Sequence, residues 1–217
     1  ANSADTTLGS PFNVFLRSPE LGDHLQKMGS HIRFKSTLGP KLTELAILVT
    51  ARHWTAQYEW HAHHRLALQA GLDPAIAAAI AQGQRPASMS AEEAAIYDFC
   101  HELHSTTRVS DAAYQGVFSR FGEQGVMDLI AVNGYYVLVA MTLNAHQLPL
   151  PEGVNESKRI SDVAESMGLI VRPMGHLNVM SPPLIISESD VDFIAETLSA
   201  AITQVTDDLV REGLRLG

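Results

Sequence analysis

The stretch from Tyr58 to Arg65, YEWHAHHR, holds three histidines and one glutamate within about two helical turns. Imidazole and carboxylate groups bind metal ions or move protons near neutral pH. On a helix, Glu59 and His63 are four residues apart and share one face, whereas His61 and His64 share another. The four groups therefore form two pairs that point in different directions.

A metal site is not expected from this pattern. Zinc requires three or four ligands that converge at about 2 Å, and two diverging pairs do not supply them. Other segments or a second subunit would have to contribute, and the candidate side chains are those of Glu44, His53, His101 and His104. A metal-dependent hydrolase or lyase that uses the histidine cluster is kept as a weaker alternative.

The face with Glu59 and His63 suits proton transfer, because a neighbouring carboxylate can hold one tautomer of an imidazole. Glu44 adds a second carboxylate to an apolar helix, where burial is costly without a purpose. In the alternative interpretation, Glu59 and His63 form an exposed pair that stabilises the helix by about 0.2–0.5 kcal/mol, and Glu44 interacts with the helix dipole. Spacing alone favours this alternative, and it predicts that His61 and His64 are surface or interface residues.

The elements that must position these residues are helices. Apolar periodicity, N-caps and glycine ends predict an all-α bundle from about residue 20 to residue 146. Ser90 and Glu93 form a capping box, and Gly122 should end a helix. The last helix is apolar on nearly all sides, so it should be central or face an oligomer partner. The expected helices span residues 21–34, 41–54, 55–71, 74–83, 91–106, 111–121 and 123–146.

The character of the chain changes at LPLPEGVNESKR, residues 148–159, where prolines and charges predict a boundary. We expect a helical domain over 1–153 and an α+β segment over 154–217, so the protein is mainly α. The second segment should contain a short helix over 161–167, a hairpin around Met174-Gly175 and a final helix capped by Ser187. The apolar stripe of that final helix is expected to comprise Ile194, Leu198, Ile202, Val205 and Leu209.

Composition excludes several classes. Among 217 residues, 46% are hydrophobic and 18% charged, which suits a packed core, and the net charge of −9 argues against nucleic-acid or anionic-membrane partners. Cys100 is the single cysteine, so no internal disulfide and no CxxC motif exists; we expect it in the core. The longest apolar run is shorter than the roughly 20 residues of a membrane span. Without signal-peptide features, a cytoplasmic location is expected.

Two segments resemble a known family. ELAILVTARHWTAQYEWHAHHRLALQAGL and LIAVNGYYVLVAMTLNAHQLPLPEG are similar to the carboxymuconolactone decarboxylase and alkylhydroperoxidase D superfamily, over about residues 12–153. The peroxidase branch has a glutamate, a CxxC motif and a histidine, which correspond here to Glu44, to Ala56 and Glu59, and to His63. Without thiols, peroxide reduction is excluded, and the chain resembles the thiol-free decarboxylase-like branch.

This resemblance implies an alkylhydroperoxidase D-like bundle and a carbon–carbon lyase that acts on a small carboxylated or lactone substrate, as in aromatic degradation. His63 would be the proton donor, with Glu44 or Glu59 fixing its tautomer. It implies no cofactor, and a homo-oligomer such as a dimer, trimer or hexamer.

Three further residues complete the expected site. Tyr58 and Trp60 would line an apolar substrate pocket, although aromatic residues on a helix more often belong to a core. Arg52 would be the counter-charge for an anionic substrate.

The tail, MGLIVRPMGHLNVMSPPLIISESDVDFIAETLSAAI, resembles the C-terminal end of class III pyridoxal-phosphate-dependent aminotransferases. The large cofactor domain of that family has no counterpart in this sequence, so aminotransferase activity from this chain alone is not expected. The alternative function of another class is a non-catalytic oligomeric interaction module, in which the tail docks on itself or on a partner.

Overall fold

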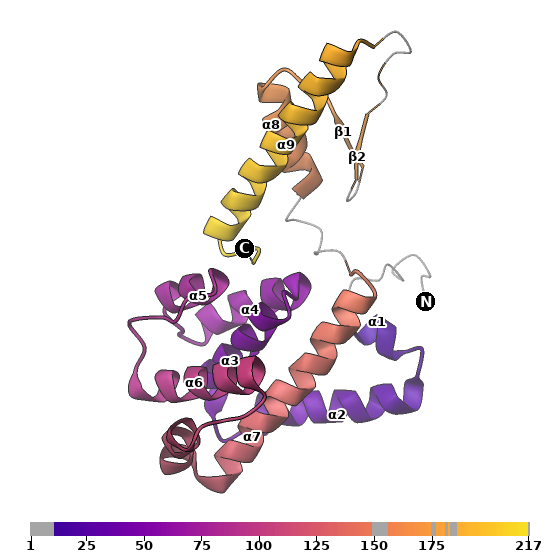
Figure 1. Ribbon diagram of the computed structural model, residues 1–217. Helices are drawn as coiled ribbons and strands as arrows, with labels where there is room; N and C mark the ends of the chain where they lie inside the picture. Colours follow the sequence, from indigo (N-terminus) through magenta and orange to yellow (C-terminus); the bar gives the residue numbers. More distant parts are fainter. Residues whose placement is uncertain (1–10, 149–155, 175–176, 181, 183–185, 217) are drawn as a thin grey trace. The chain divides into compact units, whose positions relative to one another are not determined.

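The computed structural model describes residues 11–148, 156–174, 177–180, 182 and 186–216 (Figure 1). Within this part the protein is mainly α, as predicted, with one small two-stranded sheet. The helices are α1 (Pro11–Phe15), α2 (Pro19–Lys35), α3 (Gly39–His53), α4 (Gln57–Gln69), α5 (Pro74–Ala81), α6 (Ala91–Thr106), α7 (Asp111–Ala145), α8 (Glu156–Ser166) and α9 (Glu188–Arg211), and the strands are β1 (Arg172–Met174) and β2 (Leu177–Val179).

The chain folds as two compact units. The first comprises Ala1–Leu150 with Leu216, and the second comprises Pro151–Arg215 with Gly217. The first unit contains α1 to α7, and the second contains α8, the two strands and α9. The boundary expected between residues 153 and 154 lies outside the described residues.

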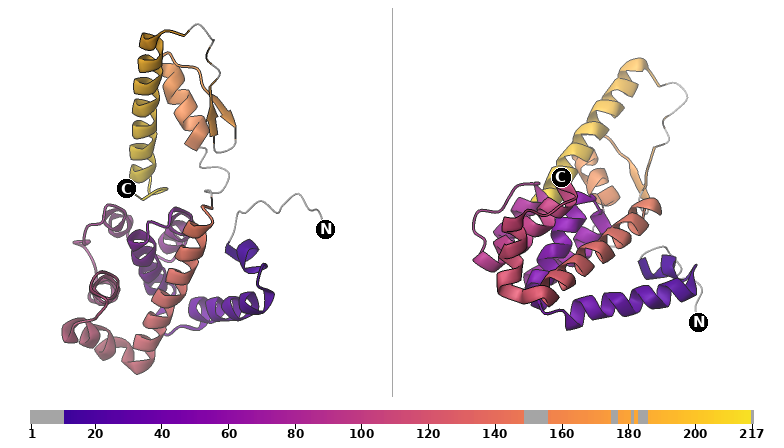
Figure 2. Two further views of the ribbon diagram at one scale, coloured as in Figure 1. Left: turned by 45° about the vertical axis from the view of Figure 1, so that its right-hand side comes forward. Right: turned by 60° about the horizontal axis from the view of Figure 1, so that its bottom comes forward.

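Helix α3 is the centre of the first unit, where it packs against α4, α6 and α7 (Figures 1 and 2). Every residue from Leu42 to Ala51 is buried, because the segment LTELAILVTA carries apolar or small side chains around the whole helix. Thr55, with a φ of 48°, makes the turn that delays the start of α4 to Gln57. The polar side chains of this segment, including that of Glu44, therefore lie in the interior.

Helix α7 is bent at Gly122, whose φ of 66° and ψ of −171° are not helical. Glycine adopts this left-handed φ without a steric penalty, so two helical segments meet at the residue where the sequence predicts a helix end. In the described part, α7 is the one helix long and apolar enough to cross a membrane, but half of its apolar window is buried, as in any core helix. Its second segment supplies much of the core.

The predicted helix starts are confirmed by their caps. The hydroxyl of Ser90 accepts a hydrogen bond from the Glu93 amide, and the Glu93 carboxylate accepts one from the Ser90 amide. Ser187 and Asp190 make the same box at the start of α9. Each box satisfies amides that the helix leaves without partners.

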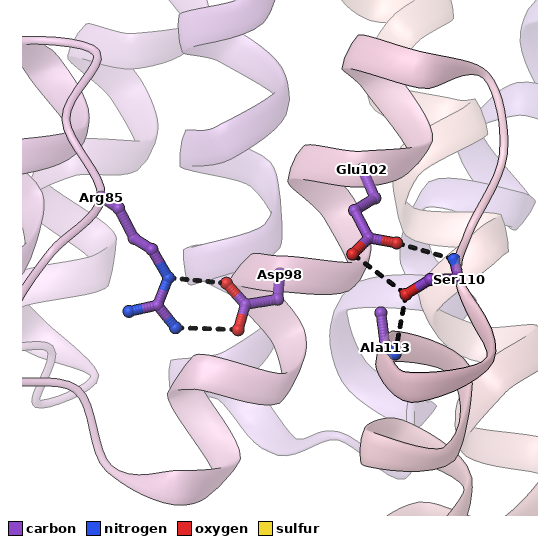
Figure 3. Close-up of polar contacts among 5 residues, drawn as sticks. All are labelled: Arg85, Asp98, Glu102, Ser110 and Ala113. Atoms are coloured by element: carbon purple, nitrogen blue, oxygen red, sulfur yellow. Dashed lines mark hydrogen bonds and ion pairs between the residues drawn. The ribbon is translucent and has the colours of Figure 1, made fainter.

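Polar contacts join α6 to its neighbours (Figure 3). The Arg85 guanidinium donates two hydrogen bonds of 2.8 Å to the carboxylate of Asp98. Glu102 accepts hydrogen bonds from the amide and hydroxyl of Ser110, at 2.7 and 3.1 Å, and the Ser110 hydroxyl accepts one from the amide of Ala113. These bonds fix the loop before α6 and the turn between α6 and α7.

The second unit packs α8 against α9, beside the antiparallel pair β1 and β2. The predicted hairpin is confirmed for the strands; its turn lies outside the described residues. One expectation for α9 is wrong, because Ile202 is 44% exposed and Ala201 is buried in its place. Ala164 of α8 is also fully buried, and two alanines allow a close approach of the helices that an isoleucine would prevent.

Candidate active site

Helices α3 and α4 bring Glu44 and His63 together. The Nδ1 atom of His63 lies 2.7 Å from Oε2 of Glu44, and both residues are buried. An ionised carboxylate only accepts hydrogen bonds, so Nδ1 carries the proton and Nε2 is the ring nitrogen left for chemistry. Of the two predicted partners of His63, the structure therefore selects Glu44.

His63 lines a cavity of about 290 Å³ between α2 and α7, called the first cavity below. This volume suits a small organic molecule. Its walls are formed by Phe15, Gln26, Gly29, Ser30, Arg33, Phe34, His63, Tyr135, Tyr136 and Val139.

Arg33 brings a positive charge to the first cavity, and sequence reasoning did not identify it. Its Nη2 atom lies 3.9 Å from Oε1 of Glu44, and its guanidinium lies over the ring of Phe34 at 5.3 Å. Its Nε is buried without a hydrogen-bond partner in the described part of the chain. Arg33 therefore offsets the charge of Glu44 and keeps a donor for another group.

Two adjacent tyrosines of α7 form the opposite wall. The ring of Tyr136 meets that of His63 edge-on at 4.9 Å, and that of Tyr135 at 5.3 Å. Burial raises the pKa of the Tyr136 phenol far above its usual range, so the group is a neutral hydrogen-bond donor. A Cβ atom at Gly29 would collide with the Tyr135 hydroxyl, which explains why α2 has a glycine where it approaches α7.

Glu59 is buried one helical turn before His63, but its carboxyl group makes no hydrogen bond to the His63 ring. It is 1% exposed, and neither carboxyl oxygen has a hydrogen-bond partner among the described residues. Burial raises the pKa of this carboxyl well above its usual range, which favours the neutral form. The interpretation of Glu59 and His63 as an exposed pair is thus wrong, and Glu59 is not among the wall residues of the first cavity.

The other predicted site residues do not reach the first cavity. Trp60 is fully buried in the core and stacks on His64 at 5.7 Å, and Tyr58 is half-buried against the same core. Arg52 lies eight residues after Glu44, about 12 Å farther along α3 at 1.5 Å per residue. It lines a different cavity.

Metal and thiol chemistry find no support in the described part of the chain, which contains no group of three or more metal-ligating side chains that could hold an ion. Cys100 is fully buried, as expected, and accepts a hydrogen bond from the Asn133 amide. Burial raises the pKa of this thiol to about 12, so it stays protonated and unreactive near neutral pH.

Comparison with known proteins finds a family likeness over part of the chain. Residues 19–97 match the model of the "Carboxymuconolactone decarboxylase family". The matched segment contains Arg33, Glu44 and His63, whereas Tyr135 and Tyr136 lie beyond it. The thiol-free pair of Glu44 and His63 is thus set in the part of the fold that carries the family likeness.

A second likeness concerns an "Uncharacterized aminotransferase y4uB" of Sinorhizobium fredii, which is 38% identical over 60 residues. The match covers 27% of this chain and 13% of that protein, so the chain spans a small part of the length of this relative. The likeness agrees with the predicted resemblance of the tail to an aminotransferase. No solved structure matched the chain.

Proposed function

We propose, from the match of residues 19–97 to the model of the carboxymuconolactone decarboxylase family, that the first cavity is the active site of a lyase. Its substrate would be a small carboxylated or lactone compound that loses carbon dioxide through general acid–base catalysis. The observation that carries this proposal is the 2.7 Å hydrogen bond between His63 and Glu44 at a cavity wall. A positioned imidazole with one free nitrogen is the usual group for proton transfer at neutral pH.

In the proposed reaction, the bond between the substrate carboxyl and its neighbouring carbon breaks, and carbon dioxide leaves. The electron pair stays on the substrate as an enolate, conjugated to a carbonyl or lactone group. Nε2 of protonated His63 then gives its proton to carbon, and the ring takes another from water. Glu44 holds the ring in place through Nδ1, and the tyrosine wall excludes water on one side.

The charges of the first cavity are compatible with an anionic substrate. Glu44 alone would repel a carboxylate, but Arg33 lies 3.9 Å from it and has a buried donor without a hydrogen-bond partner in the described part. Glu59 adds little repulsion because burial favours its neutral form. Arg33 is therefore the residue proposed to stabilise the negative charge that develops on the enolate oxygen.

The test is a carbon dioxide release assay with γ-carboxymuconolactone and a panel of related cyclic keto acids, on the purified full chain. His63→Gln should lower turnover by about a hundredfold or more while leaving the circular dichroism spectrum unchanged. His24→Gln, which changes an exposed histidine of α2, should keep full activity. Equal turnover in the two variants would refute the proposed role of His63.

A second candidate function is assembly with further copies of this chain into a dimer, trimer or hexamer. Helix α7 exposes Met127 (61%), Ile130 (42%) and Met141 (48%) in the first unit, and their spacing of 3 and 11 residues places them on one face. We expect Ile130→Glu to lower the mass found by sedimentation velocity. A monomeric wild-type protein would contradict this candidate and leave the lyase proposal standing.

A further inference from the structure

A second cavity, of about 260 Å³, lies between α3, the end of α5 and α6. It shares no wall residue with the first cavity. Its polar and small wall residues are Arg52, His53, Gly83, Tyr97, His101 and His104. One arginine and three histidines thus surround a space large enough for a small ligand.

Arg52 lines this cavity and has a donor without a partner. Its Nε is buried without a hydrogen-bond partner in the described part of the chain, a costly state for a charged group. Gly83 lies beside it with a φ of 71°, and a Cβ there would come within 3.3 Å of Nη2 of Arg52. The glycine therefore leaves the space that the guanidinium occupies.

His104 is held from behind by a buried polar network. Its Nε2 lies 3.0 Å from the hydroxyl oxygen of Thr50, which itself donates to the carbonyl oxygen of Ala46 or the side-chain oxygen of Asn133. The Thr50 hydroxyl therefore joins one ring nitrogen of His104 to this buried network. His53 stacks on His104 at 5.0 Å.

No carboxylate is among the wall residues to balance these groups. The acidic residues of α6 nearby in sequence, Asp98 and Glu102, are bound to Arg85 and Ser110 (Figure 3). Tyr97, stacked on His101, is the remaining titratable wall residue.

Two of these histidines, His53 and His104, favour the neutral form in this setting. Burial, followed by the nearby His53, lowers the pKa of His104 to about 4, and burial together with His101 lowers that of His53. An anion between the two rings would raise the pKa values of His53 and His104, because a nearby negative charge stabilises the protonated imidazole.

We propose that the second cavity binds a small oxyanion, the carboxylate or phosphate group of a small molecule, on Arg52 with uptake of a proton by the stacked pair His53 and His104. The arginine excludes a metal cation as the ligand. A planar guanidinium with an unused Nε–H suits an oxyanion, because it can donate two parallel hydrogen bonds.

Sulfate is the probe for this site, because its charge is constant between pH 6 and pH 8, so any pH dependence comes from the protein. Isothermal titration calorimetry on the full chain should show binding about tenfold tighter or more at pH 6 than at pH 8, since a bound proton accompanies the ion. Inorganic phosphate and acetate, titrated in parallel at pH 6, distinguish a phosphate site from a carboxylate site.

Arg52→Gln should weaken sulfate binding about tenfold or more. His53→Gln, at an exposed position that tolerates change, should reduce the pH dependence. Arg120→Gln, an exposed arginine outside the cavity, should change neither. Equal affinities in Arg52→Gln and Arg120→Gln, or an affinity independent of pH, would overturn the proposal.

His63→Gln separates this site from the first cavity. Sulfate binding that persists in His63→Gln and is lost in Arg52→Gln places the ion in the second cavity. The reverse pattern would place it beside Arg33 and refute the second site, whatever the outcome of the lyase assay.

Discussion

The two cavities of the first unit each combine an arginine with histidine, and they differ in whether a carboxylate bonds the imidazole. Each has an arginine, Arg33 or Arg52, whose Nε is buried without a hydrogen-bond partner in the described part of the chain. The wall of the first contains one histidine, His63, and that of the second contains three. His63 of the first cavity is bonded to the Glu44 carboxylate at 2.7 Å, whereas no carboxylate is among the wall residues of the second.

That single carboxylate changes what the imidazoles can do. In the first cavity the ring has a fixed tautomer and a charged partner, which suits repeated proton transfer. In the second, burial favours the neutral forms of His53 and His104, and we propose that they take up a proton only with an anion. The chemistry of a histidine therefore depends on the group that its ring contacts, more than on the number of histidines in YEWHAHHR.

Removing Glu44 should give the largest effect, because it makes the first cavity resemble the second. Glu44→Ala leaves His63 and Arg33 without their carboxylate in a buried site, so the free energy of unfolding should fall by about 2–4 kcal/mol. Glu44→Gln keeps an acceptor for Nδ1 and should cost about 1 kcal/mol. Urea unfolding measures both, and an unchanged midpoint for Glu44→Ala would show that the hydrogen bond does not stabilise the fold.

Unlike Glu44, which bonds His63, Glu59 has a buried carboxyl group without a hydrogen-bond partner in the described part of the chain. Burial raises its pKa in the folded state, so its contribution to stability is fully present below its unfolded pKa and is lost as pH rises through the folded value. Glu59→Gln does not titrate. The difference in unfolding free energy, wild type minus variant, should therefore fall as pH rises from 5 to 8, with a slope of at most about 1.4 kcal/mol per pH unit.

Urea unfolding at each pH tests this slope. Glu123→Gln, at an exposed position of α7, is the control and should give a difference independent of pH in the same range. A flat difference for Glu59→Gln would mean that its carboxyl is ionised in the folded protein.

The second cavity depends on Thr50, which holds His104. Thr50→Val removes a fully buried hydroxyl that bonds His104 and Asn133, so unfolding free energy should fall by about 1–2 kcal/mol. Thr43 on the same helix is also buried, but its hydroxyl has no partner among the described residues. Thr43→Val should accordingly be within about 0.5 kcal/mol of neutral, or stabilising. Equal losses at both positions would show that the network to His104 adds nothing.

The sequence predicts the fold and the pairing of Glu44 with His63 because those features are local. Helix periodicity, the Ser90 cap and the bend at Gly122 depend on neighbouring residues. Glu44 and His63 come from consecutive helices whose packing the family resemblance also implies. Arg33 and Tyr136 were missed because they meet across about a hundred residues of chain, and no local spacing encodes that contact.

Arg52 was assigned to the wrong cavity because a local feature, its nearness in sequence to Glu44, does not determine which cavity a side chain lines. Nearness in sequence to Glu44 suggested a shared site, but eight residues of helix carry the guanidinium to another cavity. Trp60 likewise follows the rule that large aromatic residues on a central helix pack in the core. The sequence identifies side chains that can take part in chemistry, but the packing of α2 and α7 determines which of them line the same cavity.

The smallest expected effects are the changes in unfolding free energy on replacing Arg85, which is in an exposed ion pair, and Arg52, which lines the second cavity. Arg85 lies outside the second cavity in an exposed ion pair with Asp98 (Figure 3), so Arg85→Gln should lower the unfolding free energy by about 0.2–1 kcal/mol and leave sulfate affinity unchanged. Arg52→Gln should do the opposite, because it removes a buried donor without a partner and loses the proposed ligand contact. Its stability should change by less than about 0.5 kcal/mol while sulfate affinity falls. If Arg52→Gln were the more destabilising of the two, Arg52 would stabilise the fold through contacts other than its unpartnered Nε. That result would contradict the role of Arg52 as a residue kept for ligand binding.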